Sequence, residues 1–165
     1  MKWTKAKTAI VAGAAVILAT ATVVSVLLHH RNHSLIFSST RELTGNDNAR
    51  FVRLTGTTPA VAAKTFLEAC SANDWTEAGK YLNLSPEFLK KYPTFFETFT
   101  NAYGGLEIVS LGKPFKGRVI MFGGMEYPGV YVPYEIRLKD GTVKKWQLAI
   151  RCDNRENHWY WDGGM

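Results

Sequence analysis

His158 is the residue whose type and position best suit it to act as a general base. It begins the segment HWYWD, in which His158, Tyr160 and Asp162 alternate with two tryptophans. An imidazole exchanges protons near neutral pH, so one that lies inside a pocket can serve acid–base catalysis. On the expected alternation the tryptophans fill the core and His158 points the other way, although a slip of one residue reverses this assignment. We expect no established catalytic residue, and His158 is the one candidate for such a role.

Three aromatic residues on the predicted sheet are the candidate ligand contacts: Tyr134, Trp146 and Tyr160. Tyr134 and Trp146 share the inward side of their strands with Ile136 and Leu148, so this side carries apolar and aromatic groups without a carboxylate. Such a surface suits an apolar ligand better than it suits proton transfer. The alternative is that all three aromatics are ordinary core residues.

The two cysteines, Cys70 and Cys152, both fall on the inward sides of their predicted elements. An exported domain permits a disulfide between them, and closing so long a loop stabilises a fold by about 2–4 kcal/mol. The alternative is two buried thiols that act as small apolar side chains. We expect no metal, because the clustered His29, His30 and His33 lack further ligands and are interpreted as a solvated flank. We expect no cofactor either, since the glycine pairs lack the spacing of a phosphate-binding loop.

An uncharged run of 21 residues, Thr8–Leu28, lies near the N-terminus. As a helix it is about 31 Å long, which matches the ~30 Å hydrocarbon core of a bilayer. Three lysines precede it, and they favour a cytoplasmic N-terminus with the rest of the chain exported. The sequence therefore predicts a single-pass signal-anchor in the cell membrane. The alternative is secretion after cleavage near Ala21, because Ala19–Ala21 has the small-x-small form of a signal-peptidase site.

The charge of the chain is concentrated at its N-terminus. Of the 20 lysines and arginines, four lie in residues 1–31, and this segment has no acid. The remaining 134 residues hold 16 basic and 14 acidic side chains, so they are close to neutral. Nucleic-acid binding needs a basic face that displaces counterions from phosphates, and we therefore expect no nucleic-acid partner.

The chain divides into three parts on these patterns. Residues 1–31 comprise the cytoplasmic lysines and the anchor, 32–57 form a linker, and 58–165 form the folded domain. The linker assignment rests on weak periodicity and on Asn46–Asn48, which indicates a turn. Phe51–Leu54 is expected either as a short strand or as a segment that packs on the domain.

Three helices are expected at the start of the domain. Each begins at a cap residue followed by a residue that suits a first helical turn. The second helix is expected to run to about Leu82, and Pro93 must break or kink the third. The cap signals are Thr58-Pro59, Asp74 with Glu77, and Ser85-Pro86; the third helix carries an aromatic stripe that we assign to the core, namely Phe88, Tyr92, Phe95, Phe96 and Phe99.

From Leu106 onward the apolar residues recur with a period of two, which is typical of half-buried strands. Asp140-Gly141 is a hairpin signal between two of these strands. Helices followed by an antiparallel meander predict an α+β domain, with about three helices packed on a curved antiparallel sheet of four to five strands. The expected strands cover residues 106–111, 118–122, 130–138, 145–152 and 158–162.

The domain resembles the nuclear-transport-factor-2-like, or cystatin-like cone, superfamily. The resemblance is carried by "TPAVAAKTFLEACSANDWTEAGKYL" near the start of the domain and by "WQLAIRCDNRENHWYWDGGM" at its end. It covers about residues 58–165 and rests on pattern. It implies a cone whose helices and sheet enclose a pocket, in a superfamily that includes isomerases, dehydratases and polyketide cyclases beside non-catalytic binding and dimerisation modules. One departure is that Asn83–Ser85 leaves no room for the strands that fuller members insert between the early helices.

A fold of this kind does not choose a function by itself. Our leading hypothesis is a membrane-anchored, extracytoplasmic binding or interaction module, which meets the lipid bilayer through residues 8–28 and takes a small apolar ligand or a protein partner. The first alternative is a small cone-fold enzyme, of isomerase or dehydratase type, that acts on an apolar substrate with His158 as base. The second is a structural module that forms a homodimer through the outer sheet face, with Tyr131, Arg137 and Arg151 in contact.

Overall fold

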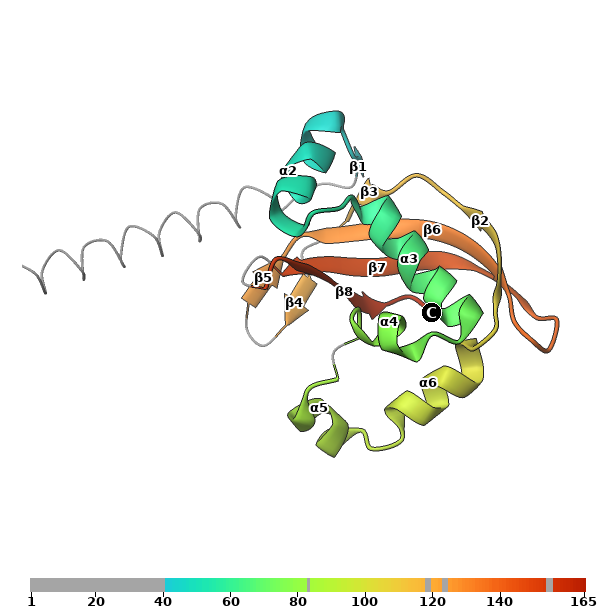
Figure 1. The fold of residues 1–165 in the computed structure, drawn as a ribbon. Helices are drawn as coiled ribbons and strands as arrows, with labels where there is room; N and C mark the ends of the chain where they lie inside the picture. The colour runs from blue at the N-terminus through green and yellow to red at the C-terminus, as the bar shows by residue number, and fades with distance from the viewer. Residues whose placement is uncertain (1–40, 83, 118–119, 123–124, 154–155) are drawn as a thin grey trace, which may run out of the picture. The chain divides into compact units, whose positions relative to one another are not determined.

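The computed structural model of the protein describes residues 41–82, 84–117, 120–122, 125–153 and 156–165. The predicted anchor over residues 8–28, the cleavage site near Ala21 and the histidines at 29, 30 and 33 lie outside these ranges. No helix within them is long and apolar enough to cross a membrane. The described part is an α+β domain in which helices precede an antiparallel sheet, as the sequence predicts (Figure 1).

Five helices occupy the first half of the described chain, and three of them are longer than six residues. The predicted caps are present: Thr58, Asp74 and Ser85 each accept a hydrogen bond from the backbone N–H three residues on. The second predicted helix ends at Gly79, earlier than expected, and Pro93 separates the third into two. The helices are α2 (Gly45–Thr55), α3 (Pro59–Ala72), α4 (Trp75–Gly79), α5 (Pro86–Lys91) and α6 (Phe95–Tyr103).

The sheet has six strands in the order β1-β3-β6-β7-β8, with β2 paired to the other end of β6. A separate two-stranded hairpin is formed by β4 and β5. The sequence predicted β2, β4, β6, β7 and β8, and it missed the short β1, β3 and β5. The strands are β1 (Arg41–Glu42), β2 (Glu107–Leu111), β3 (Phe115–Lys116), β4 (Ile120–Phe122), β5 (Met125–Tyr127), β6 (Gly129–Arg137), β7 (Val143–Asp153) and β8 (His158–Gly163).

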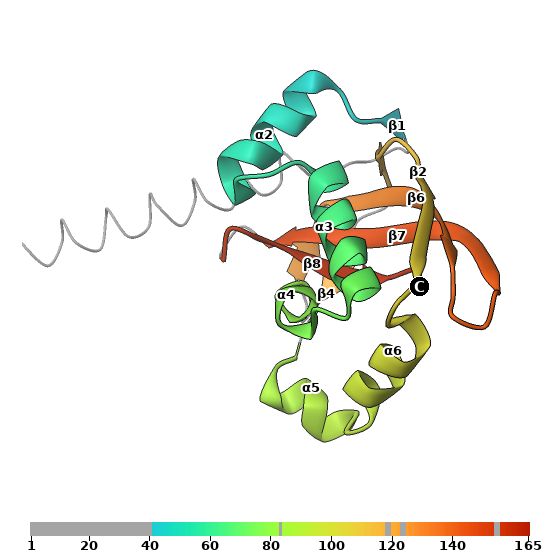
Figure 2. The ribbon, with the colours of Figure 1, turned by 45° about the vertical axis from the view of Figure 1, so that its right-hand side comes forward.

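The core lies between one face of this sheet and the helices α2 and α3, which both cover that face (Figures 1 and 2). The predicted alternation holds, because Val132, Ile136 and Leu148 are at most 1% exposed and point to the helices. Trp159 on β8 joins them and packs on Phe51 of α2, with ring centroids 4.8 Å apart. We call this side of the sheet the helix face and the opposite side the outer face.

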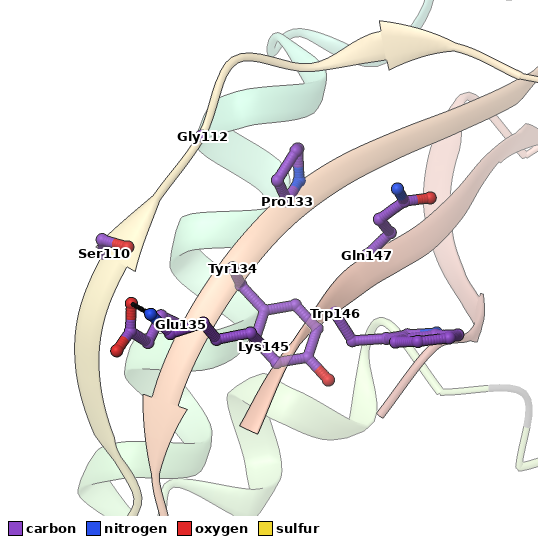
Figure 3. A pocket seen from close by; sticks show the side chains of 8 residues that line it. All are labelled: Ser110, Gly112, Pro133, Tyr134, Glu135, Lys145, Trp146 and Gln147. Atoms are coloured by element: carbon purple, nitrogen blue, oxygen red, sulfur yellow. Dashed lines mark ion pairs between the residues drawn. The ribbon is translucent and has the colours of Figure 1, made fainter. Parts of the chain in front are cut away.

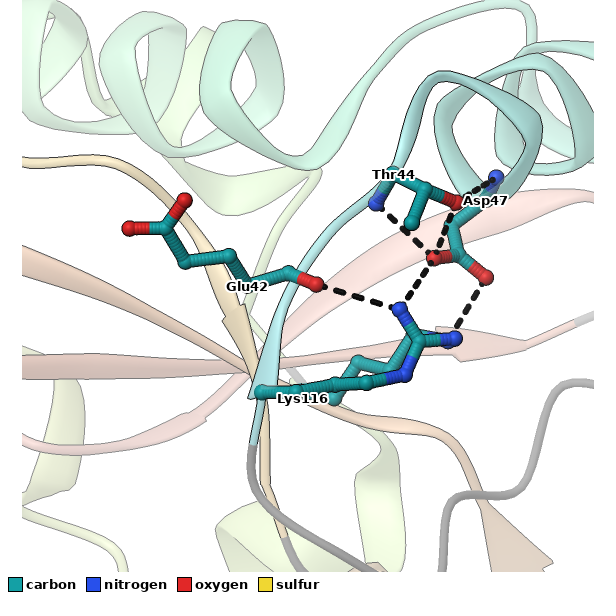
Figure 4. A network of polar contacts seen from close by, with 5 residues as sticks. Glu42, Thr44, Asp47 and Lys116 are labelled. Atoms are coloured by element: carbon teal, nitrogen blue, oxygen red, sulfur yellow. Dashed lines mark hydrogen bonds and ion pairs between the residues drawn. The ribbon is translucent and has the colours of Figure 1, made fainter.

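Helix α2 corrects the predicted linker over residues 32–57. The turn expected at Asn46–Asn48 is instead the first turn of this helix, because the Thr44 hydroxyl caps the Asp47 N–H while the Asp47 carboxylate accepts from the Thr44 N–H. Phe51 and Leu54 are then buried in the core. The carboxylate also pairs with Lys116 of β3, Nζ to Oδ1 at 2.7 Å, which fastens the helix to the sheet edge (Figure 4).

The outer face is covered in part around Arg151, whose side chain is 4% exposed. Its guanidinium carbon lies 4.8 Å from the Tyr127 ring centroid, at the end of the β4–β5 hairpin, and 4.7 Å from that of Tyr160. Asp153 and Asp162 lie at 3.3 and 3.5 Å from its nitrogens. Because a buried charge needs such partners, this cluster places the hairpin against β7 and β8.

Strand β8 pairs with only part of β7. The pairing runs from Ala149 to Asp153, with a register shift between Ala149 and Ile150. The first half of β7, from Val143 to Leu148, pairs with β6 on one side. On its other side no strand of the described chain is paired with it.

Candidate functional site

An aromatic cavity of about 520 Å³ opens between the α5–α6 turn, helix α6 and the end of β8. Its walls come from segments about 60 residues apart in the sequence, so only the folded chain assembles it. None of the residues that line it is an aspartate, a glutamate or a histidine. The apolar members of the wall are Tyr92, Pro93, Phe95, Phe99, Ala102, Tyr103, Trp161 and Met165.

The spacing of aromatic residues on α6 explains how the cavity forms. Pro93 ends α5 and lets the chain restart as α6 at Phe95. Phe95, Phe99 and Tyr103 are then four residues apart and lie on one helical face, with successive ring centroids 5.9 and 5.0 Å apart. Trp161, on the helix face of β8, closes the other side, 5.4 Å from Phe99.

The C-terminal residues bring Met165 to this cavity. The buried Tyr134 hydroxyl donates a hydrogen bond to the Gly164 carbonyl, with an O–O distance of 2.7 Å. Burial raises the pKa of Tyr134 to about 12, with a smaller contribution from Tyr103, so the hydroxyl stays a neutral donor. Gly164 has φ +84°, and a Cβ there would lie 1.9 Å from the Gln147 carbonyl oxygen. Only glycine therefore lets the chain pass this close to β7.

A second hollow of about 460 Å³ lies along β2, β6 and β7 (Figure 3). Glu135 and Lys145 form an ion pair across it, with a distance of 3.1 Å. Trp146 projects from β7 away from β2, and it is 68% exposed. Its only carboxylate is already paired with Lys145, and two of the three predicted ligand contacts, Tyr134 and Trp146, both line this hollow.

The three predicted ligand contacts do not form one site. Tyr134 and Trp146 are directly opposite each other on β6 and β7, but Tyr134 is buried and Trp146 is exposed. Tyr160 lies opposite Arg151 on the outer face, where its hydroxyl donates to Glu156. Burial, with Glu156 and Asp153, raises the pKa of Tyr160 to about 12. Tyr160 is therefore engaged in the arginine cluster and is separated from the other two by the thickness of the sheet.

His158, the candidate base, lines neither cavity. Its Nε2 lies 2.5 Å from the Lys80 carbonyl oxygen, and its ring centroid is 5.5 Å from that of Tyr81 and 5.1 Å from that of Tyr160. These contacts tie the start of β8 to the turn after α4. The arrangement gives His158 a structural position at the sheet edge and no approach to either cavity.

The predicted disulfide between Cys70 and Cys152 is not formed in this structure, in which both residues are buried thiols. Cys70 lies near the end of the sheet where β2 pairs with Arg137 of β6. Its carbonyl accepts a hydrogen bond from the Gly105 N–H, just before β2. Cys152 lies nine residues along β7 from Val143, the partner of Arg137, which is about 30 Å at ~3.3 Å per residue. Burial raises the pKa of the Cys70 thiol to about 12.

The residues expected at an outer-face dimer contact are engaged within the chain. Arg151 is buried beneath the β4–β5 hairpin, Arg137 pairs with Glu107, and Tyr131 stacks on Phe115 with centroids 5.6 Å apart. Among the described residues, no group of three or more His, Cys, Asp or Glu side chains is placed to hold a metal ion.

Sequence reasoning missed the aromatic cavity because it assigned the stripe after Pro93 wholly to the core. Phe99 is indeed buried, but Tyr92 is 46% exposed and Phe95 and Tyr103 are half-buried. The signal available in the sequence is the break at Pro93, and in the structure the helix before this break, α5, has no buried residue.

Comparison with known proteins found no match: no family model, no curated protein and no solved structure resembles the chain closely enough to be reported. The class that the fold and the site define is thus an α+β domain with helices on one face of an antiparallel sheet and an aromatic cavity at one end.

Proposed function

We propose that the protein is a membrane-anchored, extracytoplasmic binding module of the cystatin-like cone type, and that its aromatic cavity takes an apolar ligand. The anchor is the uncharged run over residues 8–28, and secretion after cleavage near Ala21 is the alternative. The order of helices and strands supports the cone assignment. The observation that carries the function is the cavity formed by α6, Trp161 and Met165.

The size and the wall of the cavity support ligand binding. Ligand pockets range from about 300 to 1,000 Å³ and are mostly apolar, with few polar groups. The cavity of about 520 Å³ falls in that range, and its lining includes two threonines and one lysine beside the aromatic rings. The enzyme alternative has less support, because His158 faces the Lys80 carbonyl and the lining lacks a carboxylate or an imidazole.

Native mass spectrometry of the full chain, released from non-ionic detergent micelles, tests this proposal. The first spectrum is of the protein as purified, since extra mass that disappears on denaturation identifies a ligand carried from the cell. Dodecan-1-ol is then added as a neutral apolar probe, and the fraction of chains carrying one molecule is measured. We expect a saturable 1:1 complex.

A matched pair of variants locates the binding. Ala102 lines the cavity, so Ala102→Trp fills it, whereas Asn101→Trp places the same ring on an exposed neighbouring position of α6 that does not line it. We expect Ala102→Trp to weaken binding at least tenfold and Asn101→Trp to leave it unchanged. Equal binding by both variants, or no complex with the wild-type chain, would refute the proposed site; circular dichroism checks that both variants are folded.

A further inference from the structure

Two ammonium groups contact tyrosine rings in the wall of the aromatic cavity, one near each end of α6. Lys91 lines it at the α5–α6 turn, and its Nζ lies 5.2 Å from the ring centroid of Tyr92. At the other end of α6, the Nζ of Lys144 lies 4.9 Å from the ring centroid of Tyr103 and 3.3 Å from its hydroxyl oxygen. Both tyrosine rings belong to the wall, so Lys91 is part of the lining, and Lys144, which is outside the lining, contacts the wall through Tyr103.

Lys91 and Lys144 differ in their partners from the lysines that form ion pairs with carboxylates. Lys64, Lys80, Lys116 and Lys145 each lie within 4 Å of a carboxylate. Within the described ranges neither Lys91 nor Lys144 has such a partner, and each contacts a tyrosine instead. Lys144 helps to lower the pKa of Asp140. The main cause of that lowering is the Thr142 N–H, which donates a hydrogen bond to the Asp140 carboxylate at 2.8 Å.

The sign of the charge restricts the ligand. An aromatic wall by itself attracts cations through the faces of its rings, as in sites for quaternary ammonium groups. Here the protein's own ammonium groups already lie over the two outer tyrosines, so a second cation would be repelled. An anionic group on an apolar ligand would instead meet an unpaired ammonium near either end of α6.

We infer that the ligand of this cavity is an anionic amphiphile, namely a single apolar chain or ring system that ends in a carboxylate. This inference rests on the proposed function and adds the chemical class of the ligand. The apolar part contacts Phe95, Phe99 and Trp161, and the carboxylate contacts Lys91 or Lys144.

Three probes of equal chain length separate this inference from the proposed function. Dodecanoate, dodecan-1-ol and dodecyltrimethylammonium are titrated against the full chain in non-ionic detergent, and native mass spectra give the bound fraction. At about 150 mM salt, charges farther than ~8 Å from the site are largely screened. We expect dodecanoate to bind about fivefold tighter than the alcohol, the upper range for a partly exposed ion pair, and the ammonium compound to bind more weakly than both.

Charge reversal assigns the effect to these two lysines. Lys91→Glu and Lys144→Glu are each expected to reduce the fivefold preference for dodecanoate over dodecan-1-ol. The double variant is expected to abolish this preference. Lys90→Glu is the matched control, because Lys90 is exposed on α5 beside Lys91 and does not line the cavity. Equal binding of dodecanoate and dodecan-1-ol by the wild type, or an equal effect of Lys90→Glu, would overturn this inference and leave the proposed function standing. Failure of all three probes to bind would overturn both.

Discussion

Replacing Asp47 by asparagine tests the ion pairs that join α2 to the sheet. The Asp47 carboxylate accepts from the Thr44 N–H at 2.9 Å and pairs with Lys116 at 2.7 Å. The side chain of Lys116 is 3% exposed and that of Asp47 is 10% exposed, so this ion pair is shielded from water. The asparagine oxygen can still accept from Thr44, so the substitution chiefly removes the charge that faces Lys116 and the more exposed Arg41, whose Nη1 lies 3.2 Å from Asp47 Oδ2.

The pKa of Asp47 gives the size of the effect. Burial alone would raise this pKa, but the Lys116 ammonium and the Thr44 donors outweigh it and hold the pKa at about 2, against 3.8 ordinarily. A depressed pKa stabilises the fold above the unfolded value and loses this contribution as the pH falls from about 4 to about 2. The difference corresponds to about 2 kcal/mol at neutral pH. Leaving a buried ammonium without its carboxylate adds to this, so we expect Asp47→Asn to lower the free energy of unfolding by about 2–4 kcal/mol.

The assay is urea unfolding of the full chain in detergent, followed by tryptophan fluorescence, at several pH values between 7 and 2. The wild type is expected to lose about 2 kcal/mol more than the variant as the pH falls through this window. Adding Lys116→Met to Asp47→Asn should restore part of the stability, because the buried charge is then absent. Glu68→Gln is the control, since its pair with Lys64 is more than half exposed and should contribute under ~0.5 kcal/mol. An Asp47→Asn variant as stable as Glu68→Gln, with the same pH profile as the wild type, would refute the reasoning.

Three further predictions concern the cluster on the outer face, the exposed tryptophan and the thiols. Arg151→Met removes a guanidinium that lies between two tyrosine rings and beside two carboxylates. We expect it to lower the free energy of unfolding by about 3 kcal/mol in the same urea assay. A change below ~0.5 kcal/mol would contradict the structural role of the cluster. Trp146→Ser should change that free energy by less than ~0.5 kcal/mol because the ring is 68% exposed, whereas Phe51→Ala, in the core, should lower it by about 3–5 kcal/mol. Cys70 and Cys152 should react with iodoacetamide at pH 8 only after unfolding, since both are buried and the pKa of Cys70 is about 12; a denatured, non-reduced mass two daltons below that of the reduced chain would show a disulfide and contradict this structure.

Local signals in the sequence were sufficient for most of the elements. Thr58, Asp74 and Ser85 start their helices as expected, because a cap hydrogen bond depends only on the next three residues. The alternation along β6 and β7 was also read correctly, and a buried sheet face fixes it. These features need no knowledge of distant contacts.

The failures arose where long-range contacts decide. Helix α2 begins with residues that favour turns, and its capping box, Thr44 with Asp47, is a local signal that was overlooked. Its stabilisation by Lys116 and by the burial of Phe51 depends on long-range contacts that no local pattern reports. The grouping of Tyr160 with Tyr134 failed because residues of like type lie on opposite faces of one sheet. The aromatic cavity was missed for a related reason, since whether an aromatic stripe becomes core or wall depends on how far the helix extends beyond the sheet.

The half of β7 that is not paired with β8 bears on self-association of the protein through this strand edge. An open strand edge can template pairing with the same strand of another molecule, and the exposed Trp146 would favour such a contact. Lys144 and Lys145 lie on this edge, and in an antiparallel pairing of two copies centred there lysine faces lysine. This like-charge repulsion makes the edge a poor template for self-association, while a strand of different sequence would meet no such barrier.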